Sequence, residues 1–114
     1  MSIGKNKKFS FAQLAVIARL FGALSEPNRL VLLQGLFGGP RTVSQLVEAC
    51  SMKQANVSKH LGVLHNHGLV KRKRAGISVH YEIADPMVLA LCNLVCGKLE
   101  SDAKCAAAMF APDI

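Results

Sequence analysis

Three cysteines near the carboxyl end of the chain have the residue type and spacing for soft-metal chemistry. Cys92 and Cys96 are four residues apart, and Cys105 follows nine residues after Cys96. On a helix, side chains four residues apart lie one turn apart, with β-carbons about 5 to 6 Å from each other, which is beyond the roughly 3.8 Å of a disulfide. A thiophilic ion such as trivalent arsenic, trivalent antimony or cadmium fits between two such sulfurs, with Cys105 as a third ligand.

Other interpretations of the cysteines stay open. A redox or reactive-sulfur sensor would pair Cys105 with Cys92 or Cys96. Cysteine is also a small apolar residue that is often buried, so the thiols could only pack, and this is the interpretation that we favour for Cys50. A thiol enzyme would need a base beside its cysteine, yet the C-terminal cysteines have no histidine nearby in the sequence. We therefore expect no enzymatic activity.

A second chemical feature is a run of four consecutive cations, Lys71-Arg72-Lys73-Arg74, which leads into a glycine-containing loop. Like charges in a row repel one another, so their placement on a projecting hairpin favours contact with a phosphate backbone. Alternation along a strand sends Lys71 and Lys73 to one face and Arg72 and Arg74 to the other. We expect Arg72 and Arg74, near the tip, to contact DNA.

Amphipathic helices must position these groups. Apolar residues at a spacing of three and four predict a first helix that starts at Phe11 and ends near Leu24. Ser25 offers a cap oxygen and Pro27 suits a first helical turn, so we expect a second helix from Pro27 to about Phe37. Gly38-Gly39-Pro40 then ends it.

Two capping-box patterns follow within a short stretch. Thr42-Val-Ser-Gln45 predicts a third helix that ends near Cys50, and Ser51-Met-Lys-Gln54 predicts a fourth that ends at Gly68. The two boxes start nine residues apart, so only a tight turn joins the helices. This spacing is typical of a helix-turn-helix.

The fourth predicted helix has two different sides. Val57, Leu61 and Leu64 make a narrow apolar stripe, while the opposite side carries small, polar and basic residues. Such a side fits a major groove, because amides pair with base edges and lysines hold phosphates. An ordinary solvated helix face is the alternative, which the neighbouring cations make less attractive.

The rest of the chain predicts a hairpin and a last helix. Residues 69–74 and 78–83 are rich in β-branched side chains and flank a short loop at 75–77. Asp85 caps a helix that begins at Pro86 and is apolar on nearly every side. A helix with so much apolar surface needs cover on more than one side, so we expect a second copy of the chain to pack against it.

Composition agrees with a single nucleic-acid-binding domain. The chain has 114 residues, of which 51% are hydrophobic, and a net charge of +7. This length fits one domain, and the charge favours a polyanionic partner. No apolar run is long enough to cross a membrane, and no export signal is present, so we expect a cytoplasmic protein with reduced thiols. We assign a flexible arm to 1–8, the domain to 9–104 and a tail to 105–114.

The order of these elements resembles the ArsR/SmtB family of winged-helix transcriptional repressors. The residues that carry the resemblance are Leu24-Ser-Glu-Pro-Asn-Arg29, Val57-Ser-Lys-His-Leu61, Gly68-Leu-Val70 and Tyr81-Glu-Ile83. The resemblance implies a winged helix-turn-helix homodimer joined through its first and last helices, which binds an inverted repeat in double-stranded operator DNA and leaves it when an inducer binds. The residues expected to contact DNA are Lys53, Gln54, Asn56, Ser58, Lys59, His60, Arg72 and Arg74. For His60, packing inside the protein is the alternative.

Two metal sites of that family have no counterpart in this sequence. The Cys-Val-Cys site at the start of the third helix falls on Thr42-Val43-Ser44, which has no thiolate. The zinc pattern of the last helix keeps Asp85 but places Met87, Lys98 and Ser101 at its other positions. We therefore expect no cofactor to be required for DNA binding, and an inducer such as arsenite, antimonite or another soft metal ion at Cys92, Cys96 and Cys105.

Overall fold

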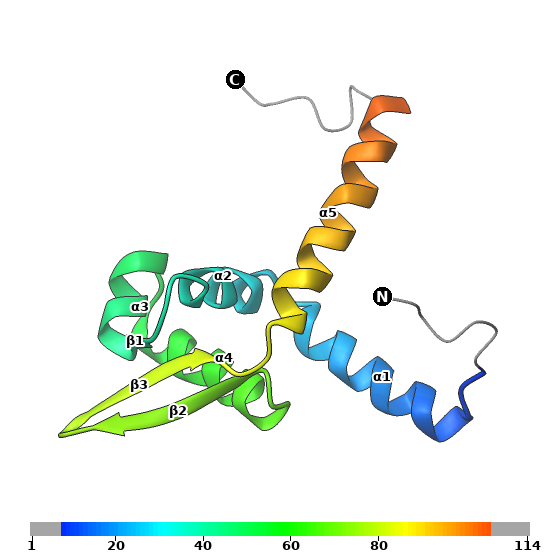
Figure 1. Cartoon of the computed structure of the whole chain (residues 1–114). Helices are drawn as coiled ribbons and strands as arrows, with labels where there is room; N and C mark the ends of the chain where they lie inside the picture. Colours follow the sequence, from blue (N-terminus) through cyan, green and yellow to red (C-terminus); the bar gives the residue numbers. More distant parts are fainter. Residues whose placement is uncertain (1–7, 106–114) are drawn as a thin grey trace.

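The computed structural model describes residues 8–105, and the side chains of residues 8–103 (Figure 1). The predicted fold, mainly helical with a β-hairpin, is confirmed. The expected arm at 1–8, apart from its last residue, and the expected tail after Cys105 lie outside the described residues. The elements in chain order are α1 (Phe11–Leu24), α2 (Pro27–Leu36), β1 (Arg41–Thr42), α3 (Val43–Cys50), α4 (Gln54–Asn66), β2 (Val70–Ala75), β3 (Ser78–Ile83) and α5 (Met87–Cys105).

Side-chain caps explain where α1, α3 and α5 begin. Thr42 forms the predicted capping box of α3: its hydroxyl accepts from the Gln45 N–H at 3.1 Å, and the Gln45 amide oxygen accepts from the Thr42 N–H at 2.9 Å. Ser10 and Gln13 form a second box at α1. The Asp85 carboxylate accepts from the Met87 N–H at 2.9 Å, as predicted for α5. Each cap is worth about 1 kcal/mol.

Two predicted caps are wrong. Ser51 ends α3 in the left-handed conformation (φ 53°), because the tight turn between α3 and α4 needs one such residue, and α4 starts after Lys53 without a side-chain cap. Ser25 belongs to the end of α1, where its hydroxyl donates to the Gly22 carbonyl at 2.7 Å. Glu26 caps α2 instead, as its carboxylate accepts from the Arg29 N–H.

The sheet has three antiparallel strands in the order β1-β3-β2. The predicted hairpin, β2 and β3, extends to Ala75, which leaves a two-residue turn with Gly76 at φ 63°. The third strand, β1, is two residues long, and sequence patterns predict no strand there because so short a segment shows no alternation. It pairs with β3, so the start of α3 is joined to the hairpin.

One core holds α2, α3, α4 and the hairpin together. Leucines and valines from each of these elements are almost fully buried, and each contributes about 1.5 to 3 kcal/mol relative to an exposed side chain. The buried hydrophobic residues are Ala23, Leu32, Leu33, Leu36, Leu46, Val57, Leu61, Leu64, Leu69, Val70 and Val88. Among these, α1 and α5 contribute only Ala23 and Val88.

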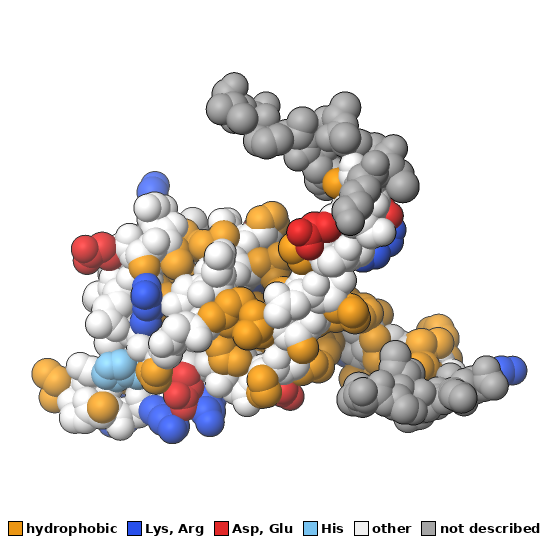
Figure 2. All heavy atoms as spheres, turned by 45° about the horizontal axis from the view of Figure 1, so that its top comes forward, with side chains coloured by type: hydrophobic (Ala, Val, Ile, Leu, Met, Phe, Trp, Pro, Cys, Tyr) orange, Lys and Arg blue, Asp and Glu red, His pale blue; other side chains and the backbone are white. Residues whose placement is uncertain are grey.

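Helices α1 and α5 project from this body and carry exposed apolar side chains (Figures 1 and 2). Phe11 on α1 is 86% exposed and Leu94 on α5 is 73% exposed. The apolar stripe predicted for α1 therefore faces outward in the single chain at Leu14 and Phe21. Across the described residues, none of the helices combines the length and the apolar character that crossing a bilayer requires.

Candidate nucleic-acid interface

Helix α4 presents a polar surface on the side opposite to the core. Val57, Leu61 and Leu64 are buried, as the stripe predicted. The exposed side carries five of the residues expected to contact DNA: Lys53, Gln54, Asn56, Ser58 and Lys59. A surface of amides, a hydroxyl and cations can pair with base edges and hold phosphates.

The start of α4 differs from the starts of α1 and α3. Lys53 precedes the first turn of α4, and no side chain accepts from the N–H groups there. At α1 and α3, by contrast, a capping box pairs with these groups. Unpaired N–H groups and the positive end of the helix dipole attract anions. The exposed Lys53 adds a positive charge at the same end, so this end of α4 suits a phosphate.

His60 is the predicted contact residue that the structure removes from this surface. Its side chain is buried, with 5% exposure, between α4 and the start of α2. Its Nδ1 lies 3.3 Å from Nη1 of Arg29, and its Nε2 lies 3.6 Å from Oε2 of Glu26. A base contact for His60 does not fit this geometry, and the packing alternative describes it correctly. Helical spacing places His60 at the edge of the apolar stripe, but it does not predict the contacts with Arg29 and Glu26.

The hairpin starts directly beside the end of α4. Gly68 turns the chain with φ 71°, and the Leu69 N–H donates to the Leu64 carbonyl at 2.9 Å. The first residue of β2, Val70, is buried in the same core as Leu61 of α4. Figure 1 shows the hairpin extending from this point beyond the helices. The cationic strand and α4 therefore belong to one rigid unit.

One side of the hairpin is partly neutralised by an acidic residue. Lys73 and Lys71 lie 3.0 and 3.5 Å from the Glu82 carboxylate. The hydrogen bond from Lys73 and the charges of both lysines lower the pKa of Glu82 below its ordinary value, although desolvation opposes this effect. In Figure 2, basic side chains lie next to an acidic one at the lower edge of the molecule. The two-residue turn sets the register that pairs Lys71 with Glu82, so a hairpin alignment could have predicted this contact.

The other side of the hairpin keeps its cations free of acidic partners among the described residues. Arg72 and Arg74 are both exposed, and neither forms an ion pair there. They share a sheet face with Val70, which packs toward α4. Arg41 of β1 and Arg72 of β2 both align with Tyr81 of β3, so Arg41 is a further cation on this face. Sequence patterns did not place Arg41 here, because they indicate no strand at β1.

Two of the candidate ligand cysteines line one groove. The groove, with a volume of about 460 Å³, lies between α1, α2 and α5, and apolar residues such as Phe21 and Leu30 form its walls. Cys92 is half-buried and Cys96 is exposed. The side chain of Cys105 lies outside the described part, and within that part no group of three potential metal ligands is found. The predicted trio is thus described only for its first two members.

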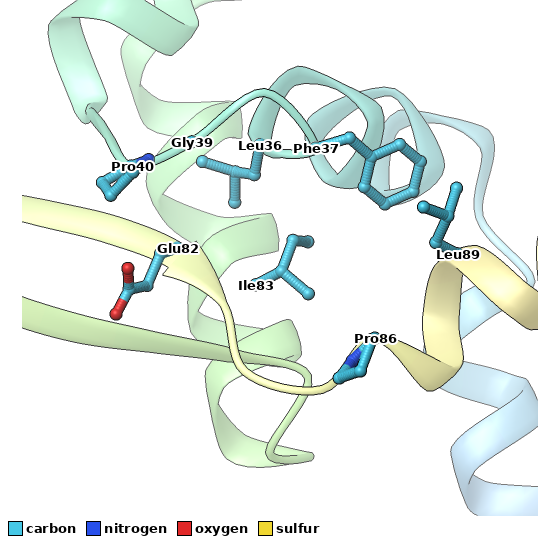
Figure 3. Close-up of a pocket in the computed structure, with 8 residues that line it drawn as sticks. All are labelled: Leu36, Phe37, Gly39, Pro40, Glu82, Ile83, Pro86 and Leu89. Atoms are coloured by element: carbon cyan, nitrogen blue, oxygen red, sulfur yellow. The ribbon is translucent and has the colours of Figure 1, made fainter.

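A second hollow marks the place where α5 leaves the body (Figure 3). It has a volume of about 280 Å³ and is lined mainly by apolar side chains, including Leu36, Phe37, Ile83 and Leu89. Glu82 borders it, but its carboxylate points away from Leu36 and Phe37 in Figure 3. The lining contains neither a thiol nor an imidazole, so this hollow has no ligand set like that of the cysteine groove.

Comparison with known proteins identifies the central part of the chain. Residues 26–72, from α2 into β2, match the model of the family described as "Bacterial regulatory protein, arsR family". The chain is 42% identical over 77 residues to a probable mercury resistance operon repressor of Streptomyces lividans. This match covers 68% of the chain and 62% of that relative, which is less than two thirds of its length.

Two solved structures extend the similarity to α1 and α5. The homodimeric winged helix-turn-helix DNA-binding domain of Mb0332 from Mycobacterium bovis is 30% identical with a TM-score of 0.70, and the alignment covers 90% of this chain and 93% of that one. The antimony-specific transcriptional repressor AntR is 29% identical with a TM-score of 0.74, and the alignment again covers 90% and 93%.

Proposed function

Since the chain belongs to the ArsR family of bacterial regulatory proteins, we propose that it is a homodimeric DNA-binding repressor, rather than an enzyme, and that a thiol-reactive inducer releases it from an inverted-repeat operator. The observation that carries the proposal is that α4 and the cationic hairpin belong to one rigid unit. The exposed polar side of α4 and the exposed arginines of the hairpin belong to elements that share one core.

In the proposed complex, α4 enters the major groove. Gln54 and Asn56 pair with base edges, while Lys53, Ser58 and Lys59 hold phosphates. Arg72 and Arg74 contact the backbone beside the groove. Lys71 and Lys73 contribute less, because Glu82 compensates part of their charge.

The second copy packs on α1 and α5. These helices carry large apolar side chains that the single chain leaves exposed, among them Phe11 and Leu94. The relative Mb0332 is homodimeric, which supports the same arrangement here. Two-fold symmetry then presents two α4 helices to half-sites about one helical turn, or roughly 34 to 36 Å, apart.

A selection from random-sequence duplexes tests the DNA-binding part. We expect an imperfect inverted repeat to be enriched. Arg72→Ala or Arg74→Ala should weaken binding to all duplexes and flatten the slope of log affinity against log salt by about 0.9 for each phosphate that the variant no longer neutralises. Lys71→Ala and Lys73→Ala are matched controls that remove the same charge from the Glu82 side and should change the slope less. No enriched repeat, or equal slopes in all four variants, would contradict the proposal.

For the inducer, we propose arsenite, antimonite or another soft metal ion bound by Cys92 and Cys96, with Cys105 as third ligand. The shared groove of the first two thiols supports this site. Mercury and antimony appear in the names of two relatives, and both elements bind thiolates strongly. The groove lies between the two helices proposed to form the dimer, so an ion bound there can change how the protomers meet.

Titration of the DNA complex with arsenite tests this site. Arsenite should release DNA from the wild type and from Cys50→Ser, whose thiol packs against α2 away from the groove. It should release little DNA from Cys92→Ser. Equal release from all three proteins would reject the site. Release by an oxidant without metal, reversed by dithiothreitol, would instead favour the redox alternative.

A further inference from the structure

The His60 imidazole is the one buried polar side chain in the described core. It belongs to α4, the helix proposed to read DNA, but it points toward the junction of α1 and α2. A buried polar group is costly unless it is hydrogen-bonded, so its partners decide what it contributes.

The partners of His60 indicate the tautomer of its neutral ring. Arg29 lies 3.3 Å from Nδ1, and a guanidinium only donates hydrogen bonds, so Nδ1 must accept. The imidazole proton is therefore assigned to Nε2, which faces the Glu26 carboxylate at 3.6 Å. Nδ1 thus has a hydrogen-bond partner, while the contact of Nε2 with the Glu26 carboxylate is longer than a hydrogen bond and is electrostatic.

The same arginine holds the end of α1. Its Nε donates to the Ala23 carbonyl at 2.6 Å, and its Nη2 donates to the Gly22 carbonyl at 3.3 Å. These carbonyls lie in the last turn of α1, where carbonyls lack the usual N–H partner four residues on and a cation is favoured. The Gly22 carbonyl also accepts from the Ser25 hydroxyl. Arg29 consequently bridges α1 and α4, while Glu26 caps α2 and faces His60. We call Glu26, Arg29 and His60, with the Gly22 and Ala23 carbonyls, the latch.

We propose that the latch fixes the orientation of α4 relative to α1, and thereby the spacing of operator half-sites that the dimer accepts. The inference rests on the proposed function, because α1 matters for spacing only if it joins the two copies. Apolar packing is non-directional and tolerates small rotations of one helix against another. Hydrogen bonds are directional, and a satisfied buried network selects one arrangement. Arg29 and His60 are accordingly positioning residues rather than DNA contacts.

Two substitutions of His60 separate positioning from simple filling of the core. His60→Leu fills a similar volume with an apolar side chain but removes both ring nitrogens. Arg29 and Glu26 then lose their contacts with this position. His60→Asn places an amide oxygen near the position of Nδ1 and keeps an acceptor for Arg29. If the imidazole only filled space, leucine would serve at least as well as asparagine.

The measurement uses the selected operator and duplexes in which the half-sites are moved apart or together by one base pair at a time. We expect the wild type to prefer one spacing sharply. His60→Leu should lose about tenfold or more of this preference, whereas His60→Asn should keep most of it. The salt dependence of binding and the dimer mass should stay the same in all three proteins.

Arg29→Met provides a second variant if His60→Leu does not fold, because it keeps an aliphatic side chain and removes all the guanidinium donors, which contact His60 and the end of α1. It should flatten the spacing profile in the same way. A wild-type spacing profile in either His60→Leu or Arg29→Met, or a profile of His60→Asn as flat as that of His60→Leu, would overturn the latch. A wild type that prefers no duplex would overturn the proposed function itself, so the two failures are distinguishable.

Discussion

The body formed by α2 to β3 and the pair of projecting helices, α1 and α5, use apolar residues in opposite ways. In the body, Leu32, Leu46 and Leu61 are fully buried, and the exposed side of α4 is polar. On the projecting helices, Leu14, Leu94 and Leu99 are substantially exposed. The body thus satisfies its own packing, while the two helices leave apolar area that water must cover in a single chain.

This difference separates the residues that fold the chain from those that assemble it. A leucine in the body stabilises the protomer, whereas a leucine on α5 stabilises the protomer little and contributes when a second copy covers it. The same substitution should therefore have different consequences in the two regions. The exposed polar surface of the body, which neither folding nor dimer formation uses, should be the surface that binds DNA.

The largest effect is expected from Leu94→Glu. Leu94 is 73% exposed, so glutamate at this position should not unfold the protomer, but it places a charge in the proposed dimer interface. The variant should be monomeric in sedimentation or native mass spectrometry. Its affinity for the operator should fall by about 10³-fold or more, to the level of non-specific binding.

Asn93→Glu adds the same charge to the same turn of α5 at an exposed polar position and serves as the control. This variant should remain a dimer, and its affinity for the operator should not change. If Leu94→Glu remains dimeric, α5 does not form the interface. The division between residues that fold the chain and residues that assemble it would then be wrong.

A matched pair of leucine-to-alanine changes tests the division directly. Leu61→Ala removes a fully buried side chain of α4 and should lower the free energy of unfolding by about 2 to 5 kcal/mol. Leu94→Ala should lower it by less than about 0.5 kcal/mol when unfolding is measured at protein concentrations where the chain is monomeric. Urea unfolding followed by circular dichroism gives both values. Similar losses would mean that Leu94, like Val88 of the same helix, belongs to the protomer core.

On the DNA side, Asn56→Ala should act on sequence preference. The amide is exposed on α4, so its removal leaves the fold intact, and the loss of a base contact costs about 1 to 3 kcal/mol at the preferred operator. Binding to unrelated duplexes should change little. Asn66→Ala, at the far end of the same helix, is the control for fluorescence-anisotropy competition. A uniform loss on every duplex would assign Asn56 to the backbone instead.

The helices of the body and the hairpin could be predicted because their signals are local. The capping box at Thr42, the proline at the start of α2 and the glycine after α4 each act within a few residues. The second capping box failed for a physical reason. Ser51 has the right residue type, but a three-residue turn between helices requires a left-handed residue at that point, and this requirement outweighs the cap.

The candidate interface was predictable only in part. Alternation correctly divided the four cations between two faces, and the helical period correctly exposed Asn56. Contacts between distant parts of the chain were not accessible: Arg29 reaches His60 across 31 positions, and β1 aligns Arg41 with the hairpin. Such contacts depend on how the helices meet, which neither propensity nor spacing specifies.

The smallest effect is expected from Glu82→Gln, which tests the difference between the two sides of the hairpin. Because the pKa of Glu82 is lowered, the carboxylate stays ionised at neutral pH and would lose its hold on Lys73 and Lys71 only as the pH falls through that lowered pKa. The amide imitates the protonated state without acid. Both lysines should then be free for phosphates, and affinity for every duplex should rise a few-fold at low salt, with a smaller gain at high salt. A gain confined to the operator, or no gain at low salt, would show that these lysines face away from DNA and that the phosphate contacts of the hairpin come from the face of Arg72 and Arg74.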